Sequence, residues 1–345
     1  MSKTILICDD STLARKQLVR SLPNNLDANI LMAANGQEAI DILTTQEVNL
    51  LFLDLNMPVM DGYDVLSTMQ INKLNVPTLV VSGDVQQQAR ERVRSMGALE
   101  FIKKPITSEK LEQLVMAMGF TTAENKEATI EQPDLNVKKQ VLEGFDVNFR
   151  DVYQELANVS MGQAGDMLSR ALGVFVTLPV PNVNLLEIAE LQMALGLADE
   201  DEATAICQGF MGRGIVGEAI LLINDVSMDS LAQLMDYSGD ITEDIEREMV
   251  MDIGNILIGS FLKSFGKLIN LDFSQGHPNI LGEHTRVNRL MHLHGKKDQR
   301  ILAVEINYGI EDTRINCYQL MLFTHDSIET LNDRVQYLTD HEQDG

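Results

Sequence analysis

The chain has 345 residues, of which 45% are hydrophobic and 23% charged, a composition typical of a globular protein long enough for two domains. No run of about 18 apolar residues occurs, and the apolar run near the N-terminus is too short for a signal peptide. We therefore expect a cytoplasmic protein without membrane spans. The net charge is −24: residues 1–120 hold 11 basic and 14 acidic residues, and residues 121–345 hold 16 and 37. An acidic C-terminal part repels phosphate backbones, which argues against nucleic-acid binding.

Three cysteines, Cys8, Cys207 and Cys317, lie far apart in apolar, strand-like segments. Because their number is odd and their surroundings are apolar, they predict buried free thiols rather than a disulfide framework.

Five short apolar segments alternate with amphipathic helical patterns over residues 1–120. Strands that alternate with helices indicate an α/β fold with a doubly wound, five-stranded parallel sheet. The expected strands are TILIC (4–8), NILMAA (29–34), LLFLDL (50–55), PTLVVSG (77–83) and LEFIKKP (99–105).

Polar residues stand where four of these strands end. Asp9 and Asp10 follow the first strand, Asp54 the third, Ser82 the fourth and Lys104 the fifth. Ligands of such sheets bind at the carboxyl ends of the strands, so these side chains are expected to converge. Three converging carboxylates favour a hard cation such as Mg²⁺, and a lysine with a hydroxyl adds donors for a phosphoryl group. The alternative is a helix N-cap at Asp9 and Asp10 and a simple turn at residues 58–62.

These motifs, ICDDS, LDLNMPVMDG, VVSGD and the Lys104–Pro105 pair, resemble the CheY-like receiver domain of two-component response regulators over residues 1–120. The resemblance implies that a histidine kinase of the CheA kind phosphorylates Asp54. It also implies that Ser82 and Lys104 contact the phosphoryl oxygens, and that Phe101 stands at the position of the switch aromatic. The implied Mg²⁺ ligands are Asp9, Asp10, Asp54 and the carbonyl of Asn56.

Apolar periodicity is lost near residue 121 and returns after the segment FTTAENKEATIEQPDLNV. This composition predicts a linker at residues 121–138 and a second domain at residues 139–345.

The second domain contains one spacing twice: acid, three residues, acid, two residues, Asn, 22 residues, Pro. Residues three apart on a helix share a face, so each acid can act together with its Asn. The two copies lie 97 residues apart (255 − 158), which indicates an internal duplication. Their members are Asp151, Glu155, Asn158 and Pro181, and Glu248, Asp252, Asn255 and Pro278.

This template resembles the CheC/CheX/FliY family of aspartyl-phosphate phosphatases, which implies an α+β domain that acts on phosphorylated CheY-like receivers without a cofactor of its own. In that family the Asn amide orients the attacking water and the acid pairs with the lysine of the receiver, roles that fall here on Asn158 and Glu155. The second copy departs from the pattern at Glu248 and Asp252. Asp is one methylene shorter than Glu, which leaves open whether Asp252 and Asn255 form a competent site.

The leading hypothesis is a chemotaxis-type response regulator whose output domain is a phosphatase. Two alternatives remain: a non-catalytic adaptor that docks on a signalling or flagellar-switch partner, and a phosphate sink that dephosphorylates its own receiver. These hypotheses differ in one measurable outcome. Only the phosphatase shortens the lifetime of the aspartyl phosphate on a separate receiver protein.

Two other patterns have simpler interpretations. GRGIVG at residues 212–217 fits a dinucleotide fingerprint, but strand-like segments flank it on both sides, so we expect a bend between strands. His292 and His294 share one face of an expected strand, but no third metal ligand stands at a telling spacing.

Overall fold

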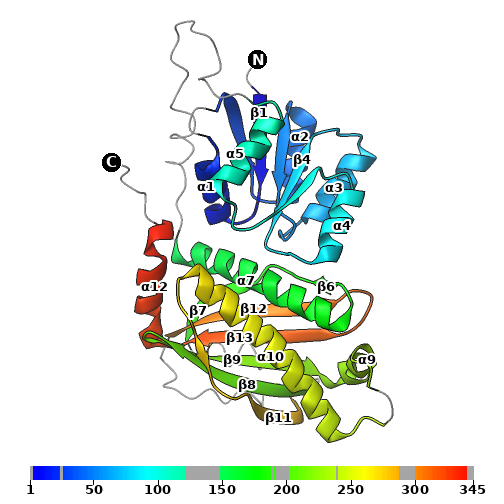
Figure 1. Ribbon diagram of the computed structural model, residues 1–345, viewed down its shortest axis with the longest axis vertical. Coiled ribbons are helices and arrows are strands. Elements are labelled where there is room, and N and C mark those ends of the chain that lie inside the picture. Colours follow the sequence, from blue (N-terminus) through cyan, green and yellow to red (C-terminus); the bar gives the residue numbers. More distant parts are fainter. Residues whose placement is uncertain are drawn as a thin grey trace, which may run out of the picture. The chain divides into compact units, whose positions relative to one another are not determined.

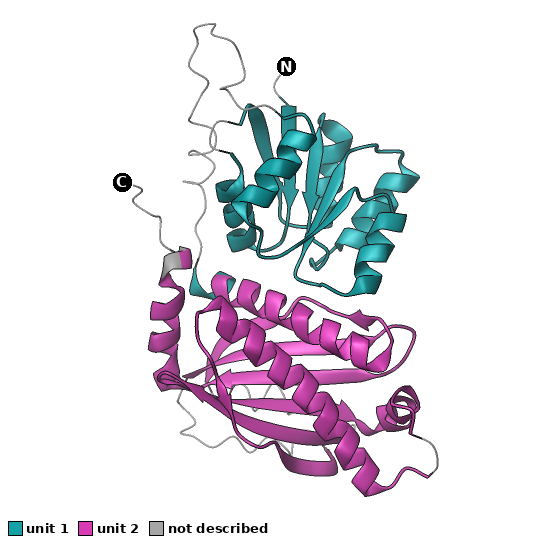
Figure 2. Ribbon diagram, viewed as in Figure 1, with its two compact units in different colours: residues 1–151 teal, residues 152–345 magenta. Residues whose placement is uncertain are grey.

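A computed structural model describes residues 3–23, 26–120, 148–187, 190, 202–237, 240–286 and 300–339. The chain divides into two compact units, residues 1–151 and residues 152–345 (Figure 2). The predicted linker at 121–138 and the histidines at 292 and 294 lie outside the described residues.

The N-terminal unit confirms the predicted parallel sheet. Its strand order is β2-β1-β3-β4-β5, and every neighbouring pair is parallel. The strands are β1 Lys3–Cys8, β2 Ala28–Ala33, β3 Leu50–Leu53, β4 Thr78–Ser82 and β5 Glu100–Lys103. The three central strands are almost wholly apolar, as expected for a sheet covered on both faces.

Helices cover both faces of this sheet (Figure 1). They are α1 Thr12–Ser21, α2 Gly36–Thr45, α3 Gly62–Ile71, α4 Gln87–Ser95 and α5 Ser108–Ala117. Side chains of α2, α3 and α4 share one core with strand residues such as Leu51 and Val80, and α1 contacts α5 on the other face. The N-cap of α1 is Ser11, whose hydroxyl accepts the Ala14 N–H at 3.1 Å. The capping role proposed as an alternative for Asp9 and Asp10 therefore belongs to Ser11.

The C-terminal unit is a mixed α+β structure built on one antiparallel sheet of eight strands. The order is β10-β8-β9-β13-β12-β6, with β11 also paired to β8 and β7 to β12. Its strands are β6 Val176–Thr177, β7 Asn182–Glu187, β8 Glu202–Gly212, β9 Ile215–Asn224, β10 Ser274–Gln275, β11 Asn279–Arg286, β12 Arg300–Ile310 and β13 Asn316–Phe323. Its helices are α7 Phe149–Leu172, α9 Met228–Leu234, α10 Glu243–Leu268 and α12 His325–Thr339, with a 3₁₀ turn η2 at Asp225–Ser227.

The elements of this unit recur in the same order. Helix α7 corresponds to α10, strands β6 to β9 correspond to β10 to β13, and α9 corresponds to α12, at about the offset that separates Asn158 from Asn255. Pro181 and Pro278 directly precede the corresponding strands β7 and β11, at strand starts where the missing N–H costs no ladder bond. This repetition is the arrangement expected of a duplicated unit.

The two halves exchange their outer strands. Strands β6 and β7 of the first half pair with β12 of the second, and β10 and β11 of the second half pair with β8 of the first. The halves meet along β9 and β13.

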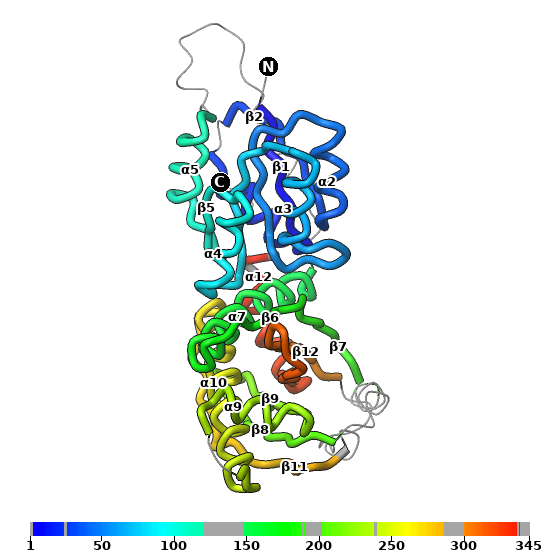
Figure 3. Tube along the Cα trace, turned by 90° about the vertical axis from the view of Figure 1, so that its right-hand side faces the viewer, coloured from blue at the N-terminus to red at the C-terminus, as the bar shows by residue number. Residues whose placement is uncertain are grey.

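The long helices α7 and α10 lie on one face of the sheet (Figures 1 and 3). Helix α10 packs through Phe261 and Phe265, and the Phe265 ring lies 5.6 Å from Phe323 of β13. Gly254 brings α10 against β8, because a Cβ at that position would overlap Ile206. Burial of such aromatic and aliphatic side chains stabilises the unit by roughly 1.5–3 kcal/mol for each large residue.

The GRGIVG segment spans the end of β8 and the start of β9, and its residues Arg213 and Gly214, both at positive φ, form the turn of this hairpin. No helix follows β8 directly, so the predicted bend is confirmed and the nucleotide fingerprint is ruled out at this position.

All three cysteines are free thiols. Cys8 and Cys317 are buried as predicted, but Cys207 is only partly buried. Burial raises the pKa of Cys317 to about 12, and burial with the nearby Glu218 raises the pKa of Cys207 to about 11. Both thiols therefore stay protonated at neutral pH.

Among the described helices, none combines the length and the apolar character needed to cross a lipid bilayer.

Candidate functional site

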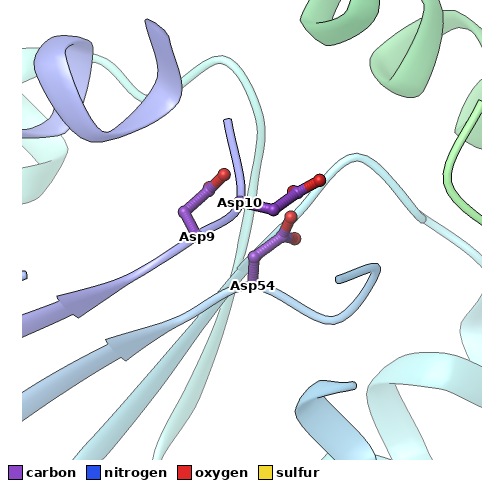
Figure 4. A group of neighbouring side chains, drawn as sticks. All are labelled: Asp9, Asp10 and Asp54. Atoms are coloured by element: carbon purple, nitrogen blue, oxygen red, sulfur yellow. The ribbon is translucent and has the colours of Figure 1, made fainter. Parts of the chain in front are cut away.

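The predicted acidic cluster forms at the carboxyl end of the parallel sheet. Asp9 and Asp10 follow β1, and Asp54 follows β3, which runs parallel to β1 in adjacent register. Carboxylate oxygens of the three residues lie within 4.8 Å of one another, and Figure 4 shows the side chains pointing into the same space. Asp9 and Asp54 are buried, and Asp10 is partly exposed. The cluster is therefore open on the side of Asp10.

Lys104 supplies the positively charged side chain of this site. Its ammonium lies 2.7 Å from Asp9 Oδ2 and 3.2 Å from Asp54 Oδ2, and its side chain is only 4% exposed. The Leu55 N–H donates to Asp54 Oδ1 at 2.8 Å, and the Ser11 N–H donates to Asp9 Oδ1 at 2.9 Å. Both carboxylates are thus held in fixed orientations by a lysine on one oxygen and a backbone donor on the other.

Ser82, Phe101 and Asn56 complete the predicted set. Ser82 ends β4 and is fully buried, and its hydroxyl accepts the Asp84 N–H at 3.1 Å. Phe101 on β5 is 6% exposed, and the Arg90 guanidinium lies 5.5 Å from its ring centroid. Asn56 follows Asp54 by two residues in the same loop, and its role as a carbonyl ligand remains a prediction.

The donor set fits a divalent cation. Three carboxylates with one ammonium leave an excess of negative charge, and oxygen donors are the ligands that Mg²⁺ takes in proteins. Cys8 lies near the same carboxylates. Burial, together with the nearby Asp9 and Asp54, raises its pKa above its ordinary range. Asp9, Asp10 and Asp54 are the residues that would hold the ion.

Arg15 belongs to this site although sequence reasoning missed it. Its guanidinium donates to the backbone carbonyls of Asp9 at 2.5 Å and of Asp10 at 3.2 Å. It therefore fixes the loop that presents both aspartates. The available signal was a basic residue in the first turn of the helix that follows an acidic pair.

The first acid–Asn pair lies within α7, as predicted, but it is not exposed. Glu155 is 5% and Asn158 only 3% exposed, and Asn158 Oδ1 accepts no hydrogen bond from the described residues. The catalytic roles of Glu155 and Asn158 therefore remain a prediction. Most other residues of α7 are buried as well, including polar ones such as Ser160 and Ser169.

The second pair, Asp252 and Asn255, lies on α10 with both side chains exposed. Tyr237 lies close enough to Glu248 and Asp252 that these carboxylates, together with desolvation as the largest cause, raise its pKa. The copy that departs from the sequence template is thus the one that solvent reaches.

Residues 5–116 match the family model for the response regulator receiver domain. The N-terminal unit is therefore a receiver domain, a module of two-component signalling. Among curated proteins, the cell cycle response regulator CtrA of Brucella ovis is 29% identical over 135 residues, 39% of this chain and 57% of CtrA. The chain thus spans little more than half the length of the curated relatives it matches.

Two solved structures are similar to parts of the chain. Thermotoga maritima FliY aligns with a TM-score of 0.43 and 17% identity, over 55% of this chain and 96% of FliY. A chain of the Borrelia burgdorferi CheX–CheY–BeF₃–Mg²⁺ complex aligns with a TM-score of 0.31 and 31% identity, over 34% of this chain and 90% of that one.

Proposed function

We propose that this chain is a response regulator that is phosphorylated on Asp54 and whose C-terminal unit hydrolyses the aspartyl phosphate of CheY-type receivers. One observation carries the proposal: a receiver site is joined to a repeated α+β unit in which both long helices bear an acid three residues before an Asn. A histidine kinase of the CheA kind would supply the phosphoryl group.

In the receiver, Asp54 is the nucleophile. Its Oδ1 is held by the Leu55 N–H, and its Oδ2 faces Lys104 at 3.2 Å. When bound by Asp9, Asp10 and Asp54, Mg²⁺ would neutralise charge that develops during phosphoryl transfer. Lys104 would neutralise the remaining charge, and Ser82 would donate its hydroxyl to a phosphoryl oxygen.

In the C-terminal unit, the Asn amide would orient a water in line with the aspartyl oxygen that leaves. The neighbouring acid would pair with the lysine of the docked receiver. Phosphoryl transfer depends mostly on positioning and electrostatics, so two side chains suffice when the substrate brings its own metal and lysine. The burial of Asn158 supports a regulated site, in which docking requires that pair to be uncovered. Asp252 and Asn255 are the pair that a docked receiver would reach without such a change.

Phosphate release from a separately prepared, phosphorylated CheY-type receiver tests this function. We expect the full chain to accelerate release in proportion to its concentration, and the Asn158→Ala/Asn255→Ala double variant to lose the acceleration. Undiminished acceleration by the double variant would contradict the assignment. Comparing each single variant with and without phosphorylation of Asp54 shows which helix acts in which state.

A non-catalytic adaptor is the second candidate, because the pair that matches the template is buried and the exposed pair departs from it. An adaptor would bind the phosphorylated receiver and leave the lifetime of its phosphate unchanged. A phosphate sink acting on its own receiver would instead show decay of the Asp54 phosphate that is independent of protein concentration and slowed by Asn158→Ala.

A further inference from the structure

A histidine in the C-terminal unit joins three elements that are distant in sequence. His284 lies on the edge strand β11, with Nδ1 2.9 Å from Asp225 Oδ2 and Nε2 3.2 Å from Glu246 Oε2. Asp225 begins the turn η2, and Glu246 belongs to the first turn of α10. One imidazole ring therefore links β11, η2 and α10.

Both contacts require a doubly protonated ring. A neutral imidazole carries one N–H, so it can donate to only one of the two carboxylates, whereas the imidazolium donates to both. The backbone holds the ring there: His284 has φ +47°, and the register of β11 against β8 shifts between Gly282 and Thr285. Because the irregular strand turns this side chain toward α10, the placement is a property of the fold.

The charged groups around the ring are mostly acidic. From η2 comes Asp225, whose Oδ1 also accepts the Thr204 hydroxyl of β8 at 3.4 Å. From α10 comes Glu246, and from β11 itself comes Glu283. Arg247 of α10 adds a cation to this cluster, because it binds Glu283.

The charge of Arg247 is already compensated. Its guanidinium binds Glu283 through two nitrogens, lies 3.1 Å from Asp244 and lies 3.6 Å from Glu243. The Asp225 hydrogen bond, followed by the charges of Asp225, Glu246 and Glu283, raises the pKa of His284 above its ordinary value, although partial desolvation opposes this.

We propose that His284 is a pH-sensitive latch: when doubly protonated it ties β11 to η2 and to the first turn of α10, and when it loses a proton it releases one of them. A histidine whose pKa is raised by folding stabilises the folded state at low pH, and this contribution is lost as pH rises through the folded pKa. The latch would therefore hold in mildly acidic solution and loosen in alkaline solution. Asn255 lies nine residues beyond Glu246, about 13.5 Å along the helix and near the middle of α10, so the latch would hold the first turn of the helix that carries the exposed pair.

The test compares His284→Gln with His277→Gln, a matched change at an exposed histidine just before β11. In NMR spectra of full-length protein labelled at histidine, we expect the imidazole of His284 to titrate above the ordinary range of histidine. Asp225→Asn should lower the titration midpoint of His284 while leaving the fold intact. A midpoint at or below the ordinary value for histidine, or one unmoved by Asp225→Asn, would overturn the latch.

Stability provides a second measurement. At about pH 6, His284→Gln should lower Tm by a few degrees relative to the unmodified chain, and the difference should vanish by about pH 9, where imidazole is neutral. His277→Gln should match the unmodified chain at both pH values. A Tm difference that stays constant with pH would assign His284 a packing role and refute the latch.

Discussion

Helices α7 and α10 carry the same spacing of acid and asparagine and lie on the same face of one sheet, yet they differ in what solvent can reach. On α7 the pair matches the family template and is buried, whereas on α10 the pair is altered and exposed. The comparison teaches that a motif determines which side chains act together but not whether a partner can reach them. Control of access, rather than chemistry alone, would then distinguish the two copies.

The largest expected effect is the loss of phosphorylation at Asp54, the residue proposed to control access to α7. Asp54→Asn should abolish phosphoryl labelling of the chain, because an amide is not a nucleophile for phosphoryl transfer. Asp64→Asn, on the exposed side of α3, should be labelled normally.

Amide hydrogen exchange tests whether phosphorylation of Asp54 changes the protection of α7 and α10 differently. Phosphorylation should lower the protection of α7 more than that of α10, and Asp54→Asn should remove this difference. Equal changes in both helices would show that access to α7 is not what phosphorylation controls.

The next largest effect is on the rate of phosphate release, and it distinguishes α7 from α10. Removing the amide that aims the water should slow accelerated phosphate release by on the order of 10²-fold, as for other well-positioned polar groups. We expect Asn255→Ala to account for the loss in the unphosphorylated chain and Asn158→Ala to add to it after phosphorylation. If Asn158→Ala has the full effect in both states, the burial of α7 does not limit docking.

A smaller effect concerns packing. Gly254 of α10 stands where α7 has Ala157, and a Cβ at Gly254 would overlap the fully buried Ile206. Overpacking of this kind costs about 1–3 kcal/mol, partly offset by about 1 kcal/mol of helix propensity, so Gly254→Ala should lower the free energy of unfolding. Gly259→Ala is the matched control, since its Cβ would meet only Gln275 Oε1 at 3.7 Å, and it should be neutral or stabilising. Urea titration measures both.

The smallest effect restores the template on α10. Asp252→Glu lengthens the side chain by one methylene and should increase accelerated phosphate release severalfold, because the longer carboxylate reaches the lysine of the docked receiver. Glu248→Asp, the other departure from the template, is the parallel change one turn earlier. A fall in rate with Asp252→Glu would show that Asp252 is already matched to its partner.

The receiver site could be read from the sequence because its geometry follows from topology. Apolar runs identified the five parallel strands, and parallel strands bring their carboxyl ends together, so Asp9, Asp54 and Lys104 had to meet. Which side chains form the hydrogen bonds around them, such as Arg15 to the loop carbonyls, depends on rotamers that no pattern specifies.

The C-terminal unit was only partly predictable. Helical spacing placed Glu155 with Asn158 on one face, and the 97-residue offset indicated the repeat. Burial of that face depends on segments distant in sequence, which periodicity cannot report. The pairing of β7 with β12 and the latch around His284 are likewise non-local, since each joins residues more than 30 positions apart.

The exchange of outer strands between the two halves of the C-terminal unit bears on how such a unit can be divided. A fragment that ends before α10 would keep β8 without its partners β10 and β11, and it would carry β6 and β7 with nothing to pair against. Unpaired edges of this kind associate with other strands, so an isolated half would be expected to complete its sheet only by joining a second copy of itself. In the full chain the two halves are covalently connected, so that association is intramolecular. If one half unfolds, the other loses the strands that pair with its edge.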